Sequence, residues 1–224
     1  MSDTPVLSIA QRRDALLKEL ADAASPPPRL IAVSKRQPED RIEEALAGGQ
    51  RIFGENQVQE AQKRWAHRRG DYPDLELHLV GALQTNKSED AVALFDVIHS
   101  LDRPKLARTL ARAMEKLGRS PKLLIQVNTG EEPQKAGVIP DELDDLLAAA
   151  RDEGLSISGL MCIPPAGEPA APHFALLARL AHERCLSEIS MGMSGDYALA
   201  ARLGATMVRV GTAVFGPRPD APVT

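Results

Sequence analysis

Short apolar runs alternate along the chain with longer stretches that have helical periodicity. Residues 122–127 are typical of these runs, because they are apolar at most positions, as strands buried on both faces of a sheet are. Strands that alternate with helices indicate parallel βαβ units. Eight such units in 224 residues favour an α/β fold with one closed (β/α)8 TIM barrel over an open doubly wound sheet. The predicted strands cover residues 30–34, 51–54, 75–81, 96–100, 122–128, 156–162, 186–191 and 207–211.

An additional N-terminal helix is predicted over residues 7–24, and the prolines at 26–28 end it because proline cannot continue a helix. The chain is expected to form a single domain, 1–224, with residues 1–28 as N-terminal helix and proline-rich turn and 217–224 as a loose tail. Residues 164–172 are expected to form a flexible loop over the functional face. Helices between the strands are predicted at 39–48, 56–68, 87–94, 103–117, 140–153, 173–183 and 195–203.

Composition and charge limit the kinds of molecule that the chain is expected to bind. The net charge of −4 and pI of about 5.8 offer no basic field for nucleic acid, and the basic stretch 63–69 is interpreted as the solvated end of a helix. No signal peptide is visible, and no apolar run approaches the roughly 18 residues of a membrane helix. Cys162 and Cys185 form no close metal-ligand pair, so no metal and a reduced cytoplasmic location are expected. Cys162 is expected to pack within the barrel.

The loops after the seventh and eighth strands are the usual phosphate site of a barrel enzyme. Ser194 and Gly195 follow the seventh strand here, and Gly211 and Thr212 end the eighth. Small residues let backbone N–H groups approach a phosphate, and hydroxyls add donors. Glycine and serine also end strands as ordinary turn residues, so this pattern alone leaves both interpretations open.

Lys35 follows the first strand directly and would face the mouth of the barrel. Partial burial lowers the pKa of a lysine and exposes a nucleophilic amine, which can form a Schiff base with an aldehyde. A surface lysine that begins a loop is the commoner case when this residue is considered alone. Beside a phosphate cradle, however, Lys35 indicates a phosphorylated carbonyl compound.

Several blocks in order along the chain resemble one family, the pyridoxal phosphate homeostasis proteins, which share the barrel fold of the alanine racemase N-terminal domain. Arg36 and Leu77 depart from the family pattern, since a small residue and an aromatic residue are expected at these positions. The blocks that carry the resemblance are Ala32-Val33-Ser34-Lys35, residues 53–60, residues 78–87, Gly159-Leu160-Met161, residues 190–197 and residues 209–216.

The resemblance implies that the cofactor is pyridoxal 5′-phosphate (PLP), held covalently as a Schiff base on Lys35. It implies that Arg209 faces the pyridine nitrogen and that Asn56 lies near the ring. The residues that it assigns to the phosphate are Ser194, Gly195, Gly211 and Thr212. Met161, at the end of the sixth strand, is included in the predicted cofactor site.

Two features favour a carrier of PLP over an enzyme. Arginine does not give up its proton in proteins, so a ring nitrogen beside Arg209 stays unprotonated and the ring is a weaker electron sink. Racemisation also needs a second acid–base, which related racemases take from a tyrosine in a further C-terminal β domain. Tyr72 falls at the wrong end of the barrel, and Tyr197 is expected to pack beside the phosphate loop.

The expected function is therefore PLP homeostasis without catalysis, by a monomer that supplies PLP-dependent apoenzymes as recipients. The alternatives are a PLP-dependent amino-acid racemase and, as the least favoured, an aldolase-like lyase that uses Lys35 on a sugar phosphate.

Among other polar residues, His78 is predicted to be a hydrogen-bonded core histidine, and His99 and His173 lack partners at motif spacing. Glu55 and Lys87 are candidates for the pocket entrance.

Overall fold

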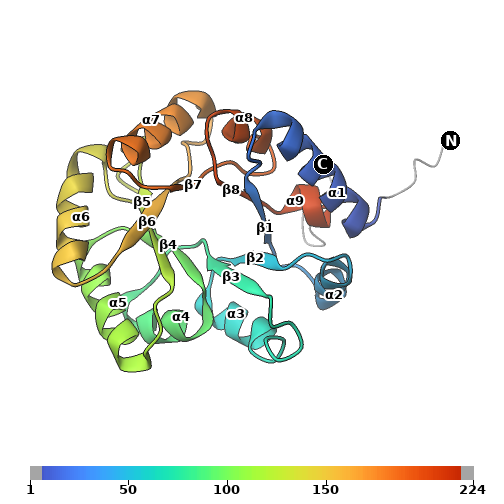
Figure 1. Ribbon diagram of the computed structural model, residues 1–224, viewed down its shortest axis with the longest axis horizontal. Helices are drawn as coiled ribbons and strands as arrows, with labels where there is room; N and C mark the ends of the chain where they lie inside the picture. Colours follow the sequence, from blue (N-terminus) through green and yellow to red (C-terminus); the bar gives the residue numbers. More distant parts are fainter. Residues whose placement is uncertain (1–6, 218–224) are drawn as a thin grey trace.

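The computed structural model describes residues 7–217. Within this range, eight parallel strands pair in sequence order and close on themselves, because β1 pairs with both β2 and β8. Helices surround the strands (Figure 1). The predicted TIM barrel with an additional N-terminal helix is therefore confirmed. The strands are β1 Arg29–Val33, β2 Ile52–Glu55, β3 Glu76–Leu79, β4 Val97–Leu101, β5 Lys122–Val127, β6 Ile157–Cys162, β7 Glu188–Ser190 and β8 Met207–Val210.

The helices of the outer ring follow the strands closely in sequence. Two single turns of 3-10 helix, η1 Thr85–Lys87 and η2 Pro140–Glu142, lead into α4 and α6. The helices are α1 Ile9–Ala23, α2 Glu39–Ala47, α3 Val58–Trp65, α4 Ser88–Leu94, α5 Pro104–Leu117, α6 Leu143–Asp152, α7 Ala170–Glu183, α8 Tyr197–Arg202 and α9 Thr212–Phe215.

The N-terminal helix α1 completes the ring between the last and first strands. A capping box begins it, in which the Ser8 hydroxyl accepts the N–H of Gln11 and the Gln11 side chain accepts the N–H of Ser8. The buried Leu16 and Leu20 face inward, and α1 packs against α8 and α9 (Figure 1). The short α9, which the sequence pattern did not predict, follows β8 directly, so α1 occupies the place of a full eighth helix.

The loop after β6 is shorter than predicted. Its last residues, Ala170 to Pro172, form the first turn of α7. Proline is tolerated there because the N–H groups of a first turn have no partner within the helix. The predicted tail, 217–224, lies outside the described residues except for Pro217.

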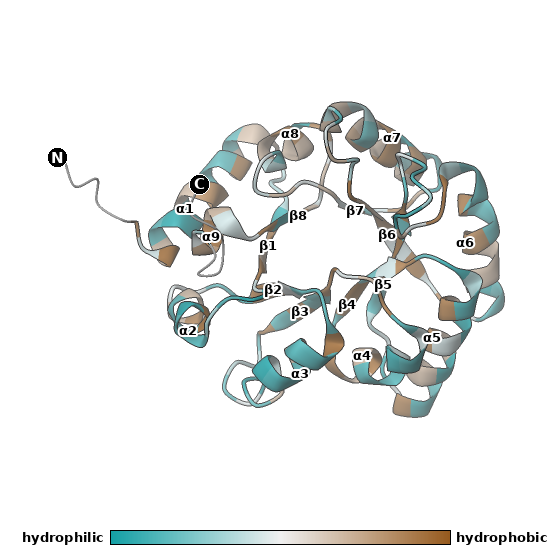
Figure 2. Cartoon of the chain, turned by 180° about the vertical axis from the view of Figure 1, so that it is seen from behind, coloured by the Kyte–Doolittle hydropathy of each residue, from teal (hydrophilic) through white to brown (hydrophobic). Residues whose placement is uncertain are grey.

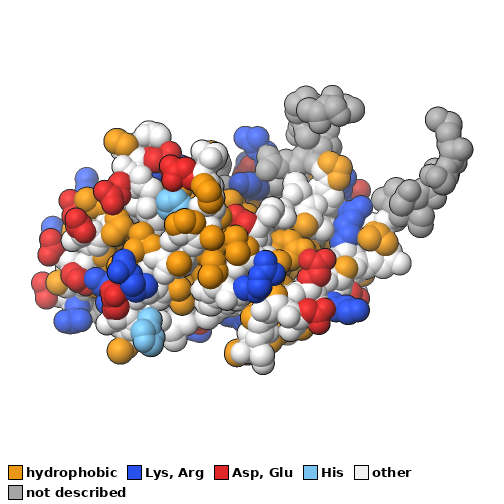
Figure 3. Space-filling model, turned by 90° about the horizontal axis from the view of Figure 1, so that it is seen from above, with side chains coloured by type: hydrophobic (Ala, Val, Ile, Leu, Met, Phe, Trp, Pro, Cys, Tyr) orange, Lys and Arg blue, Asp and Glu red, His pale blue; other side chains and the backbone are white. Residues whose placement is uncertain are grey.

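Apolar side chains fill the layer between the strands and the helices. The outward sides of the helices are mainly hydrophilic (Figure 2). Acidic and basic side chains are interspersed on the side of the molecule that Figure 3 displays. Within residues 7–217, no helix is long and apolar enough to cross a membrane. Inside the barrel, a second and smaller apolar cluster contains Ile31, Val97, Leu124, Met161 and Met207.

Candidate functional site

A pocket of about 280 Å³ lies at the carboxyl ends of the strands, close to the lower end of the range of roughly 300–1,000 Å³ typical of small-molecule sites. It contains seven of the eight residues predicted to bind a cofactor, and these residues come from the ends of β1, β2, β7 and β8. Parallel strands of a closed barrel bring such distant segments to one rim. The seven are Lys35, Asn56, Ser194, Gly195, Arg209, Gly211 and Thr212.

Lys35 is half-buried in a tight turn that directly follows β1. The N–H of Gln37 donates to the carbonyl of Ser34 at 3.0 Å and closes the turn. Arg36 occupies the left-handed region with φ 57°, a conformation that costs a non-glycine residue free energy. The departure from the family pattern noted at Arg36 therefore falls at the one strained position of the turn that carries Lys35.

A half-buried arginine on α3, Arg64, holds both ends of this turn. The guanidinium of Arg64 donates to the carbonyls of Ser34 and Gln37, each at 2.8 Å. It also donates to Glu55 Oε1 at 2.8 Å, and the same carboxylate oxygen accepts the Ser34 hydroxyl at 2.7 Å and the Trp65 indole N–H at 3.0 Å. We call Arg64, Glu55 and Trp65 the lysine-turn clamp.

The clamp corrects two expectations from the sequence. Glu55 is fully buried and does not line the pocket entrance, whereas Lys87 lines a neighbouring cavity that also includes Asn56. The basic stretch 63–69 is not only a solvated helix end, because the side chains of Arg64 and Arg68 are 12% and 9% exposed and form ion pairs with glutamates. Their spacing of four residues at the end of the predicted helix 56–68 was the signal available in the sequence, although α3 itself ends at Trp65.

The ends of β7 and β8 form the polar part of the pocket. Ser194 Oγ accepts the backbone N–H groups of Gly211 at 3.3 Å and Ala213 at 3.4 Å, which leaves its own hydroxyl hydrogen to donate. A Cβ placed on Gly195 would meet only open space. The hydroxyls of Ser194 and Thr212, which line the pocket beside this open space, are donors of the kind that an anion such as a phosphate requires.

Gly192 shapes the approach to this loop. Its φ is +90°, and a Cβ at this position would lie 2.5 Å from Cβ of Ala200 on α8. Only glycine meets both conditions without strain. The backbone of the β7 loop can therefore run close against α8 before it reaches Ser194.

Arg209 is the buried charge of the pocket. Its Nη1 donates to Ser190 Oγ at 2.7 Å and its Nη2 to the carbonyl of Cys162 at 2.8 Å. Both acceptors are neutral groups, and burial lowers the pKa of Arg209 from its usual value. Even so, a guanidinium stays protonated at neutral pH. The pocket thus combines an amine, an anion cradle and a fixed cation.

The remaining candidates lie away from the pocket lining. Met161 belongs to the apolar cluster inside the barrel, so its assignment to the cofactor site stays a prediction. Tyr197 begins α8, and its hydroxyl donates to Glu19 on α1. Cys162 is fully buried, as expected, and burial raises the pKa of its thiol to about 12.

The histidines have partners that sequence spacing did not show. His78 is buried and hydrogen-bonded, as predicted. His99 lies within hydrogen-bond distance of His78 and Ser190, and His173 of Thr129 and Glu168. Within residues 7–217, no group of three or more His, Cys, Asp and Glu side chains is arranged to hold a metal ion.

The fold and the pocket at its rim define a barrel of the alanine racemase N-terminal class, and residues 13–219 match that domain family. The chain is 41% identical over 214 residues to the pyridoxal phosphate homeostasis protein of Pseudomonas aeruginosa, covering 91% of this chain and 92% of that protein. It is 40% identical over 201 residues to the protein of that name from Vibrio alginolyticus, with coverage of 85% and 86%. The chain belongs to the pyridoxal phosphate homeostasis protein family.

Solved structures are similar to the chain as well. PipY of Synechococcus elongatus PCC7942 with PLP bound is similar with a TM-score of 0.81 and 44% identity, over 93% of this chain and 100% of that one. An alanine racemase of Clostridium difficile 630 has a TM-score of 0.69 at 14% identity, over 95% of this chain and 58% of that one. The second similarity shows the fold alone.

Proposed function

We propose that this chain binds PLP, holds it covalently as a Schiff base on Lys35, and serves PLP homeostasis rather than the turnover of an amino acid. The observation that carries the proposal is the presence of Lys35, Arg209 and the Ser194–Gly211 cradle in one pocket. An amine and an anion site in one cavity fit a phosphorylated aldehyde. The similarity to PipY, whose structure was solved with PLP bound, supports the same ligand.

Each part of the pocket has a role in this proposal. PLP supplies an aldehyde and an electron-withdrawing pyridine ring. Lys35 provides the amine, and the lysine-turn clamp orients the turn that carries it. Asn56 would lie near the ring, and Arg209 would face the ring nitrogen with an N–H donor. Ser194, Gly195, Gly211 and Thr212 would hold the phosphate.

A carrier role follows from the groups that line the pocket. Among its described lining residues, Lys35 and Arg209 are the only ionisable ones. Racemisation needs a second acid–base on the other face of the substrate, and a donor at the ring nitrogen weakens the ring as an electron sink. We therefore infer that PLP is held and released to PLP-dependent apoenzymes.

The test is a titration of purified protein with PLP, followed by visible absorption. Wild type should develop a yellow band, and Lys35→Ala should lack it. Lys105→Ala is the matched control, because Lys105 is an exposed lysine on α5, remote from the pocket lining, and it should behave as wild type. An unchanged band in Lys35→Ala would contradict the covalent assignment, and no band in wild type would contradict the cofactor.

A racemisation assay separates the carrier from the alternative enzyme. Protein loaded with PLP is incubated with several L-amino acids, and the D-enantiomer is measured against free PLP at the same concentration. The carrier proposal expects no excess over free PLP. Turnover well above free PLP that is lost in Lys35→Ala would establish a racemase instead.

A further inference from the structure

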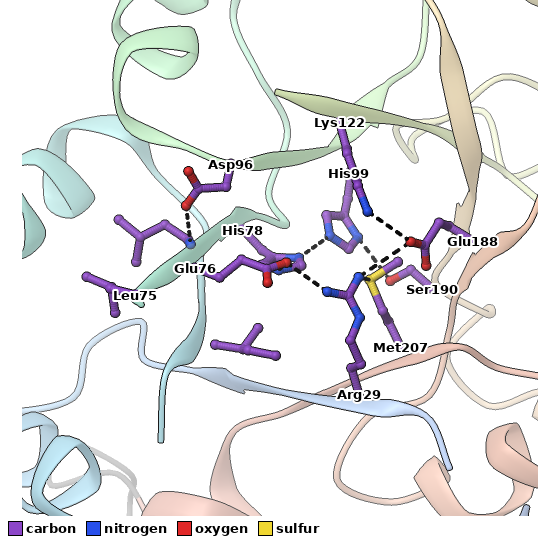
Figure 4. Close-up of polar contacts among 12 residues, drawn as sticks. Arg29, Leu75, Glu76, His78, Asp96, His99, Lys122, Glu188, Ser190 and Met207 are labelled. Atoms are coloured by element: carbon purple, nitrogen blue, oxygen red, sulfur yellow. Dashed lines mark hydrogen bonds and ion pairs between the residues drawn. The ribbon is translucent and has the colours of Figure 1, made fainter. Parts of the chain in front are cut away.

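A continuous hydrogen-bonded chain crosses the barrel interior below Arg209. Arg209 Nη1 donates to Ser190 Oγ at 2.7 Å, and Ser190 Oγ lies 3.0 Å from His99 Nδ1. His99 Nε2 lies 2.8 Å from His78 Nδ1, and His78 Nε2 lies 2.8 Å from Glu76 Oε1. Figure 4 shows the part from Ser190 to Glu76, which joins β7, β4 and β3. Ser190, His99 and His78 are fully buried.

The chemistry of the groups fixes the direction of every bond in this chain. An ionised carboxylate can only accept, so His78 Nε2–H donates to Glu76. A neutral imidazole that donates at one nitrogen accepts at the other, so His78 Nδ1 accepts from His99 Nε2–H, and His99 Nδ1 in turn accepts the Ser190 O–H. Ser190 Oγ accepts an N–H from Arg209, which can only donate. All donors therefore point away from the pocket, from Arg209 to Glu76.

The electrostatics agree with two neutral histidines. Burial lowers the pKa of His78 and lowers that of His99 further, with the neighbouring His78 and Arg209 acting in the same direction on His99. The hydrogen bond from His78 holds the pKa of Glu76 at about 2, so this carboxylate is ionised. An ionised acceptor at the end of a chain strengthens the bonds behind it, because each bond polarises the next.

The far end of the chain lies in a ring of charges at the amino-terminal end of the barrel. Arg29 binds Glu76 at 2.9 Å and approaches Glu188 at 3.6 Å, and Lys122 approaches Glu188 at 3.4 Å. These four residues begin the odd-numbered strands, as one layer of a barrel does (Figure 4). Glu76 and Glu188 both belong to the ring, and of these two carboxylates it is Glu76 that His78 contacts.

We propose that Glu76, His78, His99 and Ser190 are positioning residues that form a one-way hydrogen-bond relay, which fixes the guanidinium of Arg209 in the pocket. The proposal deepens the PLP assignment and rests on it for the identity of the group above Arg209. The relay commits an N–H of Arg209 Nη1 to Ser190, the carbonyl of Cys162 accepts one from Nη2, and the remaining N–H groups are left to the pocket. Loss of the relay should let Arg209 turn, which weakens PLP binding and changes the environment of its ring.

The first experiment reads the bond directions directly in the protein without PLP. Long-range ¹H–¹⁵N NMR spectra of uniformly ¹⁵N-labelled protein distinguish the two neutral imidazole tautomers, and the exposed His67 and His182 provide references in the same spectrum. Both His78 and His99 should carry hydrogen on Nε2 and none on Nδ1 at neutral pH. Hydrogen on Nδ1 of either residue would overturn the relay, whether or not the protein binds PLP.

The second experiment compares two carboxylate deletions in the same ring. Glu76→Ala and Ser190→Ala should each weaken PLP binding several-fold, up to about tenfold for the loss of one ordinary hydrogen bond, and shift the visible band of bound PLP. Glu188→Ala removes a ring carboxylate that does not touch a histidine and should leave both readouts unchanged. Glu76→Gln, which keeps an acceptor oxygen for His78, should restore most of the affinity.

The outcomes separate the relay from the proposed function. If wild type gives no PLP spectrum, the cofactor assignment fails while the tautomers still test the bond directions. If wild type binds PLP but Glu76→Ala and Ser190→Ala match it in affinity and spectrum, the relay fails alone. An equal effect of Glu188→Ala and Glu76→Ala would assign the effect to the charge ring and likewise overturn the relay.

Discussion

The two cysteines show how strongly burial controls the chemistry of a single residue. Cys162 is buried and its thiol has a pKa of about 12, whereas Cys185 is exposed. Because the thiolate is the reactive form, iodoacetamide should alkylate Cys185 in the native protein and leave Cys162 intact, while both react in urea. Peptide mass spectrometry checks this. Native labelling of Cys162 would contradict the burial that the barrel gives it.

The buried histidines make stability depend on pH in a defined direction. The pKa values of His78 and His99 are lowered in the folded state, so the unfolded chain binds more protons below its ordinary histidine pKa of about 6.5. Stability is then fully present above this pH and falls on acidification, by at most about 1.4 kcal/mol per pH unit for each histidine.

Urea unfolding at pH 7, 6 and 5 measures this dependence. The free energy of unfolding of wild type should fall from pH 7 to pH 5, and His99→Gln, which removes one such group, should show a shallower slope. Equal slopes in the two proteins would show that His99 takes up no proton on unfolding.

At the scale of elements, the turn between β1 and α2 depends on α3. Arg64 spans the turn with bonds to two carbonyls and a buried carboxylate, a geometry that a lysine ammonium cannot reproduce. Arg64→Lys should lower the free energy of unfolding by about 1–3 kcal/mol and weaken PLP binding by loosening Lys35.

Arg184→Lys is the matched control for this substitution. Arg184 also bridges two elements, through a bidentate pair with Asp144, but the pair lies at the surface and Asp144 is 71% exposed. An exposed pair contributes at most about 1 kcal/mol, and PLP binding should not change. If both variants bound PLP as wild type does, the clamp would have no role in orienting Lys35.

The sequence predicted the elements and the pocket residues for one physical reason. Apolar runs locate parallel strands, and the ends of these strands meet at one rim, so Lys35 and Thr212 come together without any knowledge of contacts, whereas the family resemblance supplied Asn56. Groups inside the barrel could not be predicted in this way. His99 and Ser190 are 91 residues apart in sequence, and only the register of the strands brings them into contact. The single turn of α9 is too short to show periodicity.

At the scale of the whole molecule, α1 takes the place that a helix after β8 would fill. Leu20 of α1 is fully buried in the same cluster as residues of the barrel. Leu20→Ala should therefore cost about 2–5 kcal/mol, and wild type should unfold in one transition if the chain is the predicted single domain. Urea unfolding followed by circular dichroism and by the fluorescence of Trp65 checks both. Separate transitions by the two probes would contradict one cooperative unit.

The central claim is that Lys35 carries PLP covalently in this barrel. Borohydride reduction of the protein with PLP bound, followed by peptide mass spectrometry, tests it most directly, because reduction makes a Schiff base permanent. The account predicts a phosphopyridoxyl group on Lys35 in wild type and no stoichiometric label in Lys35→Ala. Stoichiometric label on another lysine, or none in wild type, would contradict it.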